Sequence, residues 1–245
     1  MTWIKICGMT NLEDALVAVE TGADAVGFVF YEKSPRNISV EAAREICERL
    51  PEVVEKIGVF VNGSGVEACD LVLQVGLTGC QSYASEAGEA PSGSTKAMGL
   101  GCFPRRPRFL VSLRMNHLAE GEERIRKFVA DFATLKKNLP KEASALTEVM
   151  NTIVLDSGDL RTPGGTGKTF DWDKAVPIAE EMRRGGVNLV VAGGLTPENV
   201  GDAIEILKPW GVDVVSGVET SPGKKDPEKV RAFVKAVRDA DRRAS

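Results

Sequence analysis

The chain has 245 residues and a formal net charge of −4, with 43% hydrophobic and 27% charged residues. These values are ordinary for a globular protein, and no stretch reaches the apolar length of a membrane span. The negative charge argues against general attraction to nucleic acid or to a membrane surface, so a phosphorylated ligand would need a local binding site. The first residues lack the features of a secretory signal, which predicts a cytoplasmic protein.

The five cysteines, at positions 7, 47, 69, 80 and 102, are odd in number and form no CxxC pair. This pattern argues against a disulfide framework and against a zinc site. The single histidine, His117, also argues against His-based triads and multi-histidine metal centres. We therefore expect reduced thiols and no metal site.

Eight short apolar runs recur along the chain, and most are typical of buried parallel strands. They lie at residues 3–6, 25–30, 57–61, 77–84, 109–113, 152–156, 189–194 and 212–217. The run at 77–84 has the weakest strand pattern and is accepted because the regular spacing requires a strand there. Residues 94–101 are an alternative fifth strand, but 109–113 has the stronger β pattern and precedes a helical segment that ends near residue 139.

Helix-start signals follow several of these runs. They are Thr10-x-x-Glu13, Ser39 before Glu41, Thr196-Pro197-Glu198 and Asp226-Pro227-Glu228. Gly, Ser and Pro interrupt residues 85–108, which predicts an irregular or missing fourth helix.

Eight βα units without a break in composition favour one (β/α)8 TIM barrel, a single domain of the α/β class over residues 1–245. Two smaller domains are the less economical interpretation. An open doubly wound sheet is the alternative fold, but it predicts a GxGxxG turn after the first strand, where the chain has "CGMTNLED".

Residues at the C-terminal ends of the strands are the candidate site, because barrel enzymes place their chemistry there. Cys7 ends the first strand, although a cysteine in such a place is more often a packing residue. Asp156 ends the sixth strand, where a carboxylate must be hydrogen-bonded, ion-paired or directed into a pocket. Arg36 follows the second strand and can bind a carboxylate through two hydrogen bonds, or can simply be solvated.

Two glycine-containing strand ends predict a phosphate site. Gly193 and Gly194 precede a helix, and Ser216 and Gly217 end the neighbouring strand. Glycines let a phosphate approach backbone N–H groups, and the last two loops of such barrels often bind phosphate. Tight turns without a ligand are the simpler interpretation of either pair alone.

Residues 162–168, "TPGGTGK", lack the GxxxxGK[ST] spacing of a nucleotide triphosphate loop. Their glycines, including Gly165, predict a mobile lid that makes Lys168 available to an anionic ligand. A solvated loop without a role is the alternative.

Several of these segments together resemble the phosphoribosylanthranilate isomerases of the tryptophan pathway. The segments are "KICGMTNLEDA", "AVGFVFYEKSPRNIS", "IGVFVN", "VLDS", "GGTGKTFDW", "VAGGLTPENV" and "GVDVVSGVETSPGKKD". The resemblance runs from residue 3 to about 237 and is weakest between about 62 and 150. It implies an Amadori rearrangement of N-(5'-phosphoribosyl)anthranilate to 1-(o-carboxyphenylamino)-1-deoxyribulose 5-phosphate, without a metal or organic cofactor.

The resemblance also implies roles for site residues. Cys7 would be the general base, Asp156 the general acid and Arg36 the contact to the anthranilate end, with the last two glycine-containing loops at the phosphate. The chemistry needs one acid and one base, because ring opening requires a proton on the furanose oxygen and enolamine formation removes the C2' proton. A thiolate suits the second step if its surroundings lower the thiol pKa from about 8.5.

One departure and two alternatives accompany the resemblance. Tyr83 stands where the family commonly has histidine, which the chemistry does not obviously require. A related sugar-phosphate isomerase of histidine biosynthesis would typically carry aspartate in place of Cys7. A non-catalytic sugar-phosphate-binding barrel would not need Cys7, Asp156 and Arg36 together. The expected partner is a small phosphorylated substrate, and the assembly stays open between monomer and homodimer.

Overall fold

The computed structural model describes residues 1–61, 71–83, 108–114, 118–138, 149–157 and 169–244. Eight parallel strands of these residues close into a barrel in chain order. They are β1 (Trp3–Cys7), β2 (Ala25–Phe30), β3 (Glu55–Phe60), β4 (Gly79–Tyr83), β5 (Arg108–Arg114), β6 (Thr152–Asp156), β7 (Asn188–Val191) and β8 (Gly211–Val214). The pairing of β1 with β8, which sets Trp3 opposite Gly211 and Ile6 opposite Val214, closes the barrel.

The barrel confirms the predicted fold class and excludes the open doubly wound sheet. The weak run at 77–84 contains β4, and the run at 109–113 is the core of β5. α4 (Leu118–Asn138) follows β5, as the sequence predicts. Residues 84–107 lie outside the described residues, so the predicted irregular fourth helix stays a prediction.

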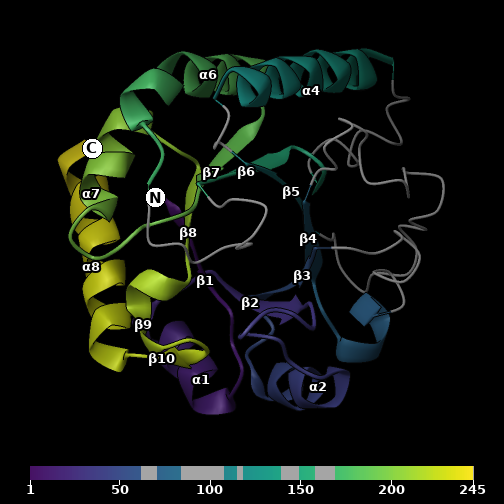
Figure 1. Ribbon diagram of the computed structural model, residues 1–245, viewed down its shortest axis with the longest axis vertical. Coiled ribbons are helices and arrows are strands. Elements are labelled where there is room, and N and C mark those ends of the chain that lie inside the picture. The colour runs from purple at the N-terminus through teal and green to yellow at the C-terminus, as the bar shows by residue number, and fades with distance from the viewer. Residues whose placement is uncertain (62–70, 84–107, 115–117, 139–148, 158–168, 245) are drawn as a thin grey trace.

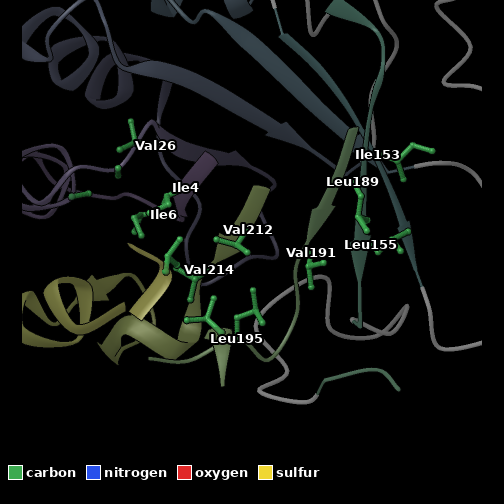
Figure 2. Packing of buried hydrophobic residues seen from close by; sticks show 14 of the residues in the cluster. Ile4, Ile6, Val26, Ile153, Leu155, Leu189, Val191, Leu195, Val212 and Val214 are labelled. Atoms are coloured by element: carbon green, nitrogen blue, oxygen red, sulfur yellow. The ribbon is translucent and has the colours of Figure 1, made fainter. Parts of the chain in front are cut away.

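Helices cover the outside of the barrel, with α1 and α2 along one side, α7 and α8 along the next, and α4 and α6 along a third (Figure 1). Their bounds are α1 (Leu12–Thr21), α2 (Val40–Arg49), α6 (Trp172–Gly185), α7 (Val200–Leu207) and α8 (Pro227–Ala244). Residues 71–75 are also helical. Side chains alternate across each strand, and the outward set forms the main apolar cluster with the helices. Figure 2 shows part of it, including Ile4, Ile6, Val212 and Val214.

Two of the predicted helix starts are confirmed. The Ser39 hydroxyl accepts a hydrogen bond from the Ala42 N–H and caps α2. The Asp226 carboxylate accepts from the N–H of Glu228 at the start of α8, whose first residue is Pro227. A side-chain acceptor at this position satisfies one of the N–H groups that a helix leaves unpaired.

The other two predicted helix starts are wrong, one of them by a single residue and the other by several residues. Asn11, not Thr10, caps α1, because its side-chain oxygen accepts from the Asp14 N–H. α7 begins at Val200, since residues 196–199 form a turn that the Asn199 side chain closes by accepting from the N–H of residue 196.

A small hairpin that the sequence analysis missed lies between β8 and α8. It follows a short 3-10 helix, η3 (Ser216–Val218), and pairs β9 (Glu219–Ser221) with β10 (Lys224–Lys225) in antiparallel fashion. Figure 1 places it beside α1. Gly223 supplies the turn with a φ of 83°, a left-handed conformation that favours glycine.

The side chains inside the barrel change from apolar to charged along the barrel axis. At the N-terminal end of the strands the inward side chains form an apolar cluster that includes Trp3, Ile57 and Leu110. One layer further, Lys5 and Asp213 bring charge into the interior. This polar layer lies directly below the C-terminal end of the barrel, where the chemistry of such folds is found.

Candidate active site

A pocket with about 660 Å³ of space, its open mouth included, lies at the C-terminal end of the strands. Of the residues singled out by the sequence, those that line it are Cys7, Arg36, Tyr83, Asp156, Gly193, Gly194 and Ser216. Gly217 lies next to Ser216 but does not line the pocket. Gly165 and Lys168 fall outside the described residues, so their part in the site stays a prediction.

Cys7 ends β1 with only 4% of its surface exposed, and its inward side chain reaches the pocket floor. Gly27 of β2 is its register partner, and a Cβ atom at Gly27 would lie 2.5 Å from the Cys7 sulfur. Burial raises the pKa of the Cys7 thiol, while the positive charge of Lys5 lowers it and the negative charge of Asp213 raises it again. The net shift is upward, so the positive charge of Lys5 offsets only part of the effect of burial on the pKa of Cys7.

Asp156 ends β6 and is 5% exposed. The hydroxyl of Tyr83, at the end of β4, donates a hydrogen bond of 3.1 Å to its Oδ2 atom. Burial raises the pKa of Tyr83 well above its ordinary value, and the negative charge of Asp156 raises it further. The phenol therefore stays protonated at neutral pH. Asp156 both accepts a hydrogen bond and lines the pocket, as expected for a carboxylate at the end of an apolar strand.

Arg36 is buried, with 8% exposure, and is not the exposed loop residue that its polar surroundings in the sequence suggest. Its Nε and Nη2 atoms donate to the two carboxylate oxygens of Glu219, at 2.9 and 2.7 Å. Gly8 makes room for it, since a Cβ atom there would lie 2.8 Å from the Arg36 Cδ atom. Nη1 donates no hydrogen bond within the described part of the chain, so it remains available at the pocket wall.

Glu219 holds two cations at once and belongs to the hairpin that the sequence analysis missed. Lys225 Nζ lies 3.0 Å from Glu219 Oε1 and also donates to the carbonyl of Val215. Burial works to raise the pKa of Glu219, but hydrogen bonds from Arg36 and Lys225 hold it below its usual value. Glu219 is thus an ionised anchor that fixes the Arg36 guanidinium beside the pocket.

The loops after β7 and β8 offer backbone N–H groups to the pocket. Gly193 and Gly194 have φ angles of 82° and 65°, which favour glycine. Within the described residues, the N–H groups of Gly194 and Ser216 donate no hydrogen bond. Gly217 packs closely against the loop after β7, because a Cβ atom there would collide with the carbonyl of Leu195.

Three further polar residues, Lys5, Gln81 and Asp213, were missed by the sequence analysis. Lys5 and Asp213 pair at 2.7 Å, and Gln81 donates to the Ser112 hydroxyl. One acceptor on each of Gln81 and Asp213, both buried and both lining the pocket, has no hydrogen-bond partner in the described part of the chain. A charge inside an apolar strand, two residues before its end, was the available signal for Lys5.

Among the residues that the structure describes, no group of three or more His, Cys, Asp or Glu side chains is arranged to hold a metal ion. The same residues contain no helix with the length and apolarity needed to cross a membrane.

The sequence matches the family described as N-(5'phosphoribosyl)anthranilate (PRA) isomerase over residues 4–99 and 113–236. The chain belongs to this family. An N-(5'-phosphoribosyl)anthranilate isomerase of Pseudomonas aeruginosa strain UCBPP-PA14 is 42% identical over 235 residues, which cover 96% of this chain and 94% of that protein. The resemblance in the strand-end motifs is therefore confirmed over nearly the whole length.

Two solved PRA isomerase structures share the fold, and each covers 98% of this chain and 100% of its own. One is a complex with reduced 1-(o-carboxyphenylamino)-1-deoxyribulose 5-phosphate, at 36% identity and a TM-score of 0.73. The other contains monomers generated from the dimeric isomerase of Thermotoga maritima, at 36% identity and a TM-score of 0.72. The family thus includes a structure with a phosphorylated ligand and a dimeric member.

Proposed function

We propose that this chain catalyses the PRA isomerase reaction of tryptophan biosynthesis with Cys7 as general base and Asp156 as general acid. The observation that carries this assignment is that Cys7 of β1 and Asp156 of β6 line the same pocket. Two strand ends at one pocket suit an acid and a base that act on different atoms of one sugar. A packing cysteine would not need to face that pocket.

The proton transfers balance with these two groups. Asp156 gives its proton to the furanose ring oxygen, and the ring C–O bond breaks to leave an open-chain protonated imine. The Cys7 thiolate then takes the proton from C2', which yields the enolamine. Tautomerisation of the enolamine gives the aminoketone product without net oxidation, and the enzyme is reset when Cys7 gives up the proton it gained and Asp156 takes one up by exchange with water.

The pocket offers separate partners to each end of the substrate. Arg36 presents Nη1 to the anthranilate carboxylate, while Glu219 holds the rest of the guanidinium in place. The N–H groups of Gly194 and Ser216, which donate no hydrogen bond within the described residues, suit the phosphate. The acceptors of Gln81 and Asp213 that have no partner in the described part of the chain suit the ribose hydroxyl groups between the two ends.

Other parts of the proposal rest on the sequence and the family. Gly165 and Lys168 would close over the bound anion, and Gly217 would support the phosphate loop from behind. We infer one barrel domain over residues 1–245 that acts in the cytoplasm without metal or organic cofactor. The protein would be a monomer or a homodimer, which light scattering coupled to size-exclusion chromatography distinguishes.

The test is turnover of freshly generated phosphoribosylanthranilate by Cys7→Ser and Asp156→Asn. Each should lose about a hundred- to ten-thousand-fold in kcat, the usual contribution of an acid or base. Cys47→Ser is the matched control, because Cys47 is a buried cysteine of α2 outside the pocket. Near wild-type turnover by Cys7→Ser would return Cys7 to a packing role, and turnover of a histidine-pathway aminoribosyl phosphate instead would favour the alternative isomerase.

A further inference from the structure

Lys5 carries a charge into the middle of the barrel. Its side chain is 0% exposed, and its ammonium lies 2.7 Å from Asp213 Oδ2 on the neighbouring strand β8, its register partner. A buried ion pair loses hydration on both sides and is often no more stabilising than an apolar pair of the same size. Fold stability is therefore a weak explanation for the Lys5–Asp213 pair.

The pair lies directly below the thiol of Cys7. Lys5 and Cys7 are two residues apart on β1, so both side chains point into the barrel. They share the space that Gly27 leaves empty, because a Cβ atom there would lie 2.5 Å from the Cys7 sulfur and 3.1 Å from the Lys5 Cε atom. The ammonium is thus held near the sulfur from below, while the pocket opens above it.

Ionisable groups face Cys7 from several elements of the described chain. Lys5 acts from β1, Asp213 from β8 and Lys225 from β10. Tyr83 of β4 and Asp156 of β6 line the same pocket. Tyr83 is neutral, so the sign of the local charge depends on the cations, the carboxylates and the thiol.

The charges around the pocket balance when Asp156 and Cys7 hold one proton between them. The described cations at or beside it are Lys5, Arg36 and Lys225, and the carboxylates are Asp156, Asp213 and Glu219. When Asp156 carries the proton that a general acid must donate, this set has one excess positive charge. A thiolate at Cys7 neutralises it, so a protonated acid and an ionised base favour each other.

We propose that Lys5, held in place by Asp213, is a positioning residue that stabilises the Cys7 thiolate required for base catalysis. The proposal rests on the assignment of Cys7 as the base. Burial alone raises the pKa of the thiol, and Lys5 is the largest influence that lowers it, through its charge and a hydrogen bond. Asp213 acts in the opposite direction on the thiol while it anchors the lysine.

The test compares two variants whose effects must have opposite signs. In Lys5→Met, the midpoint pH for alkylation of Cys7 by iodoacetamide, followed by mass spectrometry of the Cys7 peptide, should rise by about one unit, a tenfold slower reaction at pH 7. In Asp213→Asn the midpoint should fall. The acidic limb of the pH profile of kcat/KM should move with the alkylation midpoint in both variants. If Lys5 and Asp213 only support the fold, Cys7 should be alkylated faster in both variants without a shift of the midpoint. That result would overturn the proposal.

Control variants show whether a change in the alkylation midpoint comes from the proposed role of Lys5 or from a loss of folding. Lys56→Met removes a lysine that is 7% exposed and bonded to the Pro51 carbonyl, away from the pocket, and should leave the midpoint unchanged. Lys5→Met with Asp213→Asn leaves no unpaired buried ion, so it should fold, and its midpoint should lie above that of Asp213→Asn alone. If the double variant titrates like Asp213→Asn, Lys5 has no such role.

The outcome for Cys7→Ser separates the assignment of Cys7 as the base from the proposed role of Lys5. If Cys7→Ser keeps its turnover while Lys5→Met shifts the alkylation midpoint, the assignment of the base fails but the electrostatic effect of Lys5 stands. If Cys7→Ser is inactive and Lys5→Met has the wild-type midpoint and pH profile, the base stands and the role of Lys5 is rejected.

Discussion

The Tyr83 hydroxyl donates a hydrogen bond of 3.1 Å to Asp156 Oδ2 and so connects the ends of β4 and β6 inside the pocket. A phenol can donate to a carboxylate and can also accept from a carboxylic acid. The contact is therefore compatible with Asp156 before and after it gives up a proton. Since burial keeps the pKa of Tyr83 well above 10, the phenol does not ionise in either state.

We expect Tyr83→Phe to lower kcat roughly tenfold to hundredfold, the range for losing a hydrogen bond to a charged group. The melting temperature should change little, because the ring and its packing remain. Tyr83→His, which introduces the residue that the family commonly has, should retain more activity than Tyr83→Phe because it keeps a donor. Equal kcat values for wild type and Tyr83→Phe would show that the hydrogen bond does not matter for turnover.

Arg36→Ala should weaken substrate binding and, unlike an exposed arginine, should also destabilise the fold. The variant leaves the Glu219 carboxylate, 7% exposed, with one cation fewer, and breaking a buried pair typically costs about 3–5 kcal/mol. We expect a higher KM and a lower free energy of unfolding in urea. Arg44→Ala, at an exposed position of α2, is the control and should alter neither.

Adding Glu219→Gln to Arg36→Ala tests the link between the two cations that Glu219 holds. The double variant removes the carboxylate but leaves the ammonium of Lys225, which is 1% exposed, without this ionic partner, so stability should not recover while the KM stays high. An unchanged KM in Arg36→Ala would remove this residue from the substrate site.

The strands and their functional ends could be predicted because the relevant signals are local. Apolar β-branched runs indicate buried parallel strands, and once a closed barrel is assumed, every strand end faces the same mouth. This is why Cys7 and Asp156, 149 positions apart in the sequence, could be assigned to one pocket that the structure then shows.

The contacts that hold the charged side chains of the site could not be predicted. They join residues far apart in the sequence, and no sequence pattern relates the positions of the two partners. The sequence suggests that Arg36 is a solvated loop residue, because its partner Glu219 lies 183 positions later in the chain. Lys5 and Asp213 are likewise 208 positions apart. At the start of α1, two adjacent polar residues could both act as caps, and only the backbone geometry selects Asn11 over Thr10.

Asp14 ties the β9–β10 hairpin to α1 and gives a prediction on stability against pH. Its carboxylate accepts hydrogen bonds from the Lys225 N–H at 2.7 Å and from Lys224 Nζ at 3.0 Å. Burial works to raise the pKa of Asp14, but these bonds lower it below its ordinary value. The stabilisation is thus fully present above about pH 4, the pKa in the unfolded chain, and is lost as the pH falls through the lower folded-state pKa.

Asp14→Asn should therefore cost about 1–3 kcal/mol of unfolding free energy at pH 7. The difference from wild type should shrink at pH 3, where the Asp14 carboxylate of the unfolded chain also takes up a proton. Urea titrations at pH 7, 5 and 3 measure this. Glu13→Gln is the control, since its contact to Lys224 is 3.8 Å long and exposed and should contribute well under 1 kcal/mol. A difference between wild type and Asp14→Asn that does not depend on pH would argue against an ionised Asp14 as the tie.

Gly27 gives the sharpest steric test of the site. An added Cβ atom at this position would lie 2.5 Å from the Cys7 sulfur, closer than such atoms can approach, so Gly27→Ala must displace the thiol. A displacement of about 1 Å at a reacting group can lower turnover roughly a hundredfold. The unfolding free energy should fall by only about 1–3 kcal/mol, the usual cost of overpacking.

Gly58→Ala is the matched control for Gly27→Ala. Gly58 lies on β3, and a Cβ atom there would be 2.7 Å from Leu77 and 2.8 Å from Phe60, a similar degree of crowding in the outer apolar cluster away from the pocket. Gly58→Ala should therefore lose a similar amount of stability while its folded fraction keeps the wild-type kcat. If both variants lose kcat equally, general loosening of the barrel explains the loss, and the fit of Cys7 against Gly27 is not what positions the base.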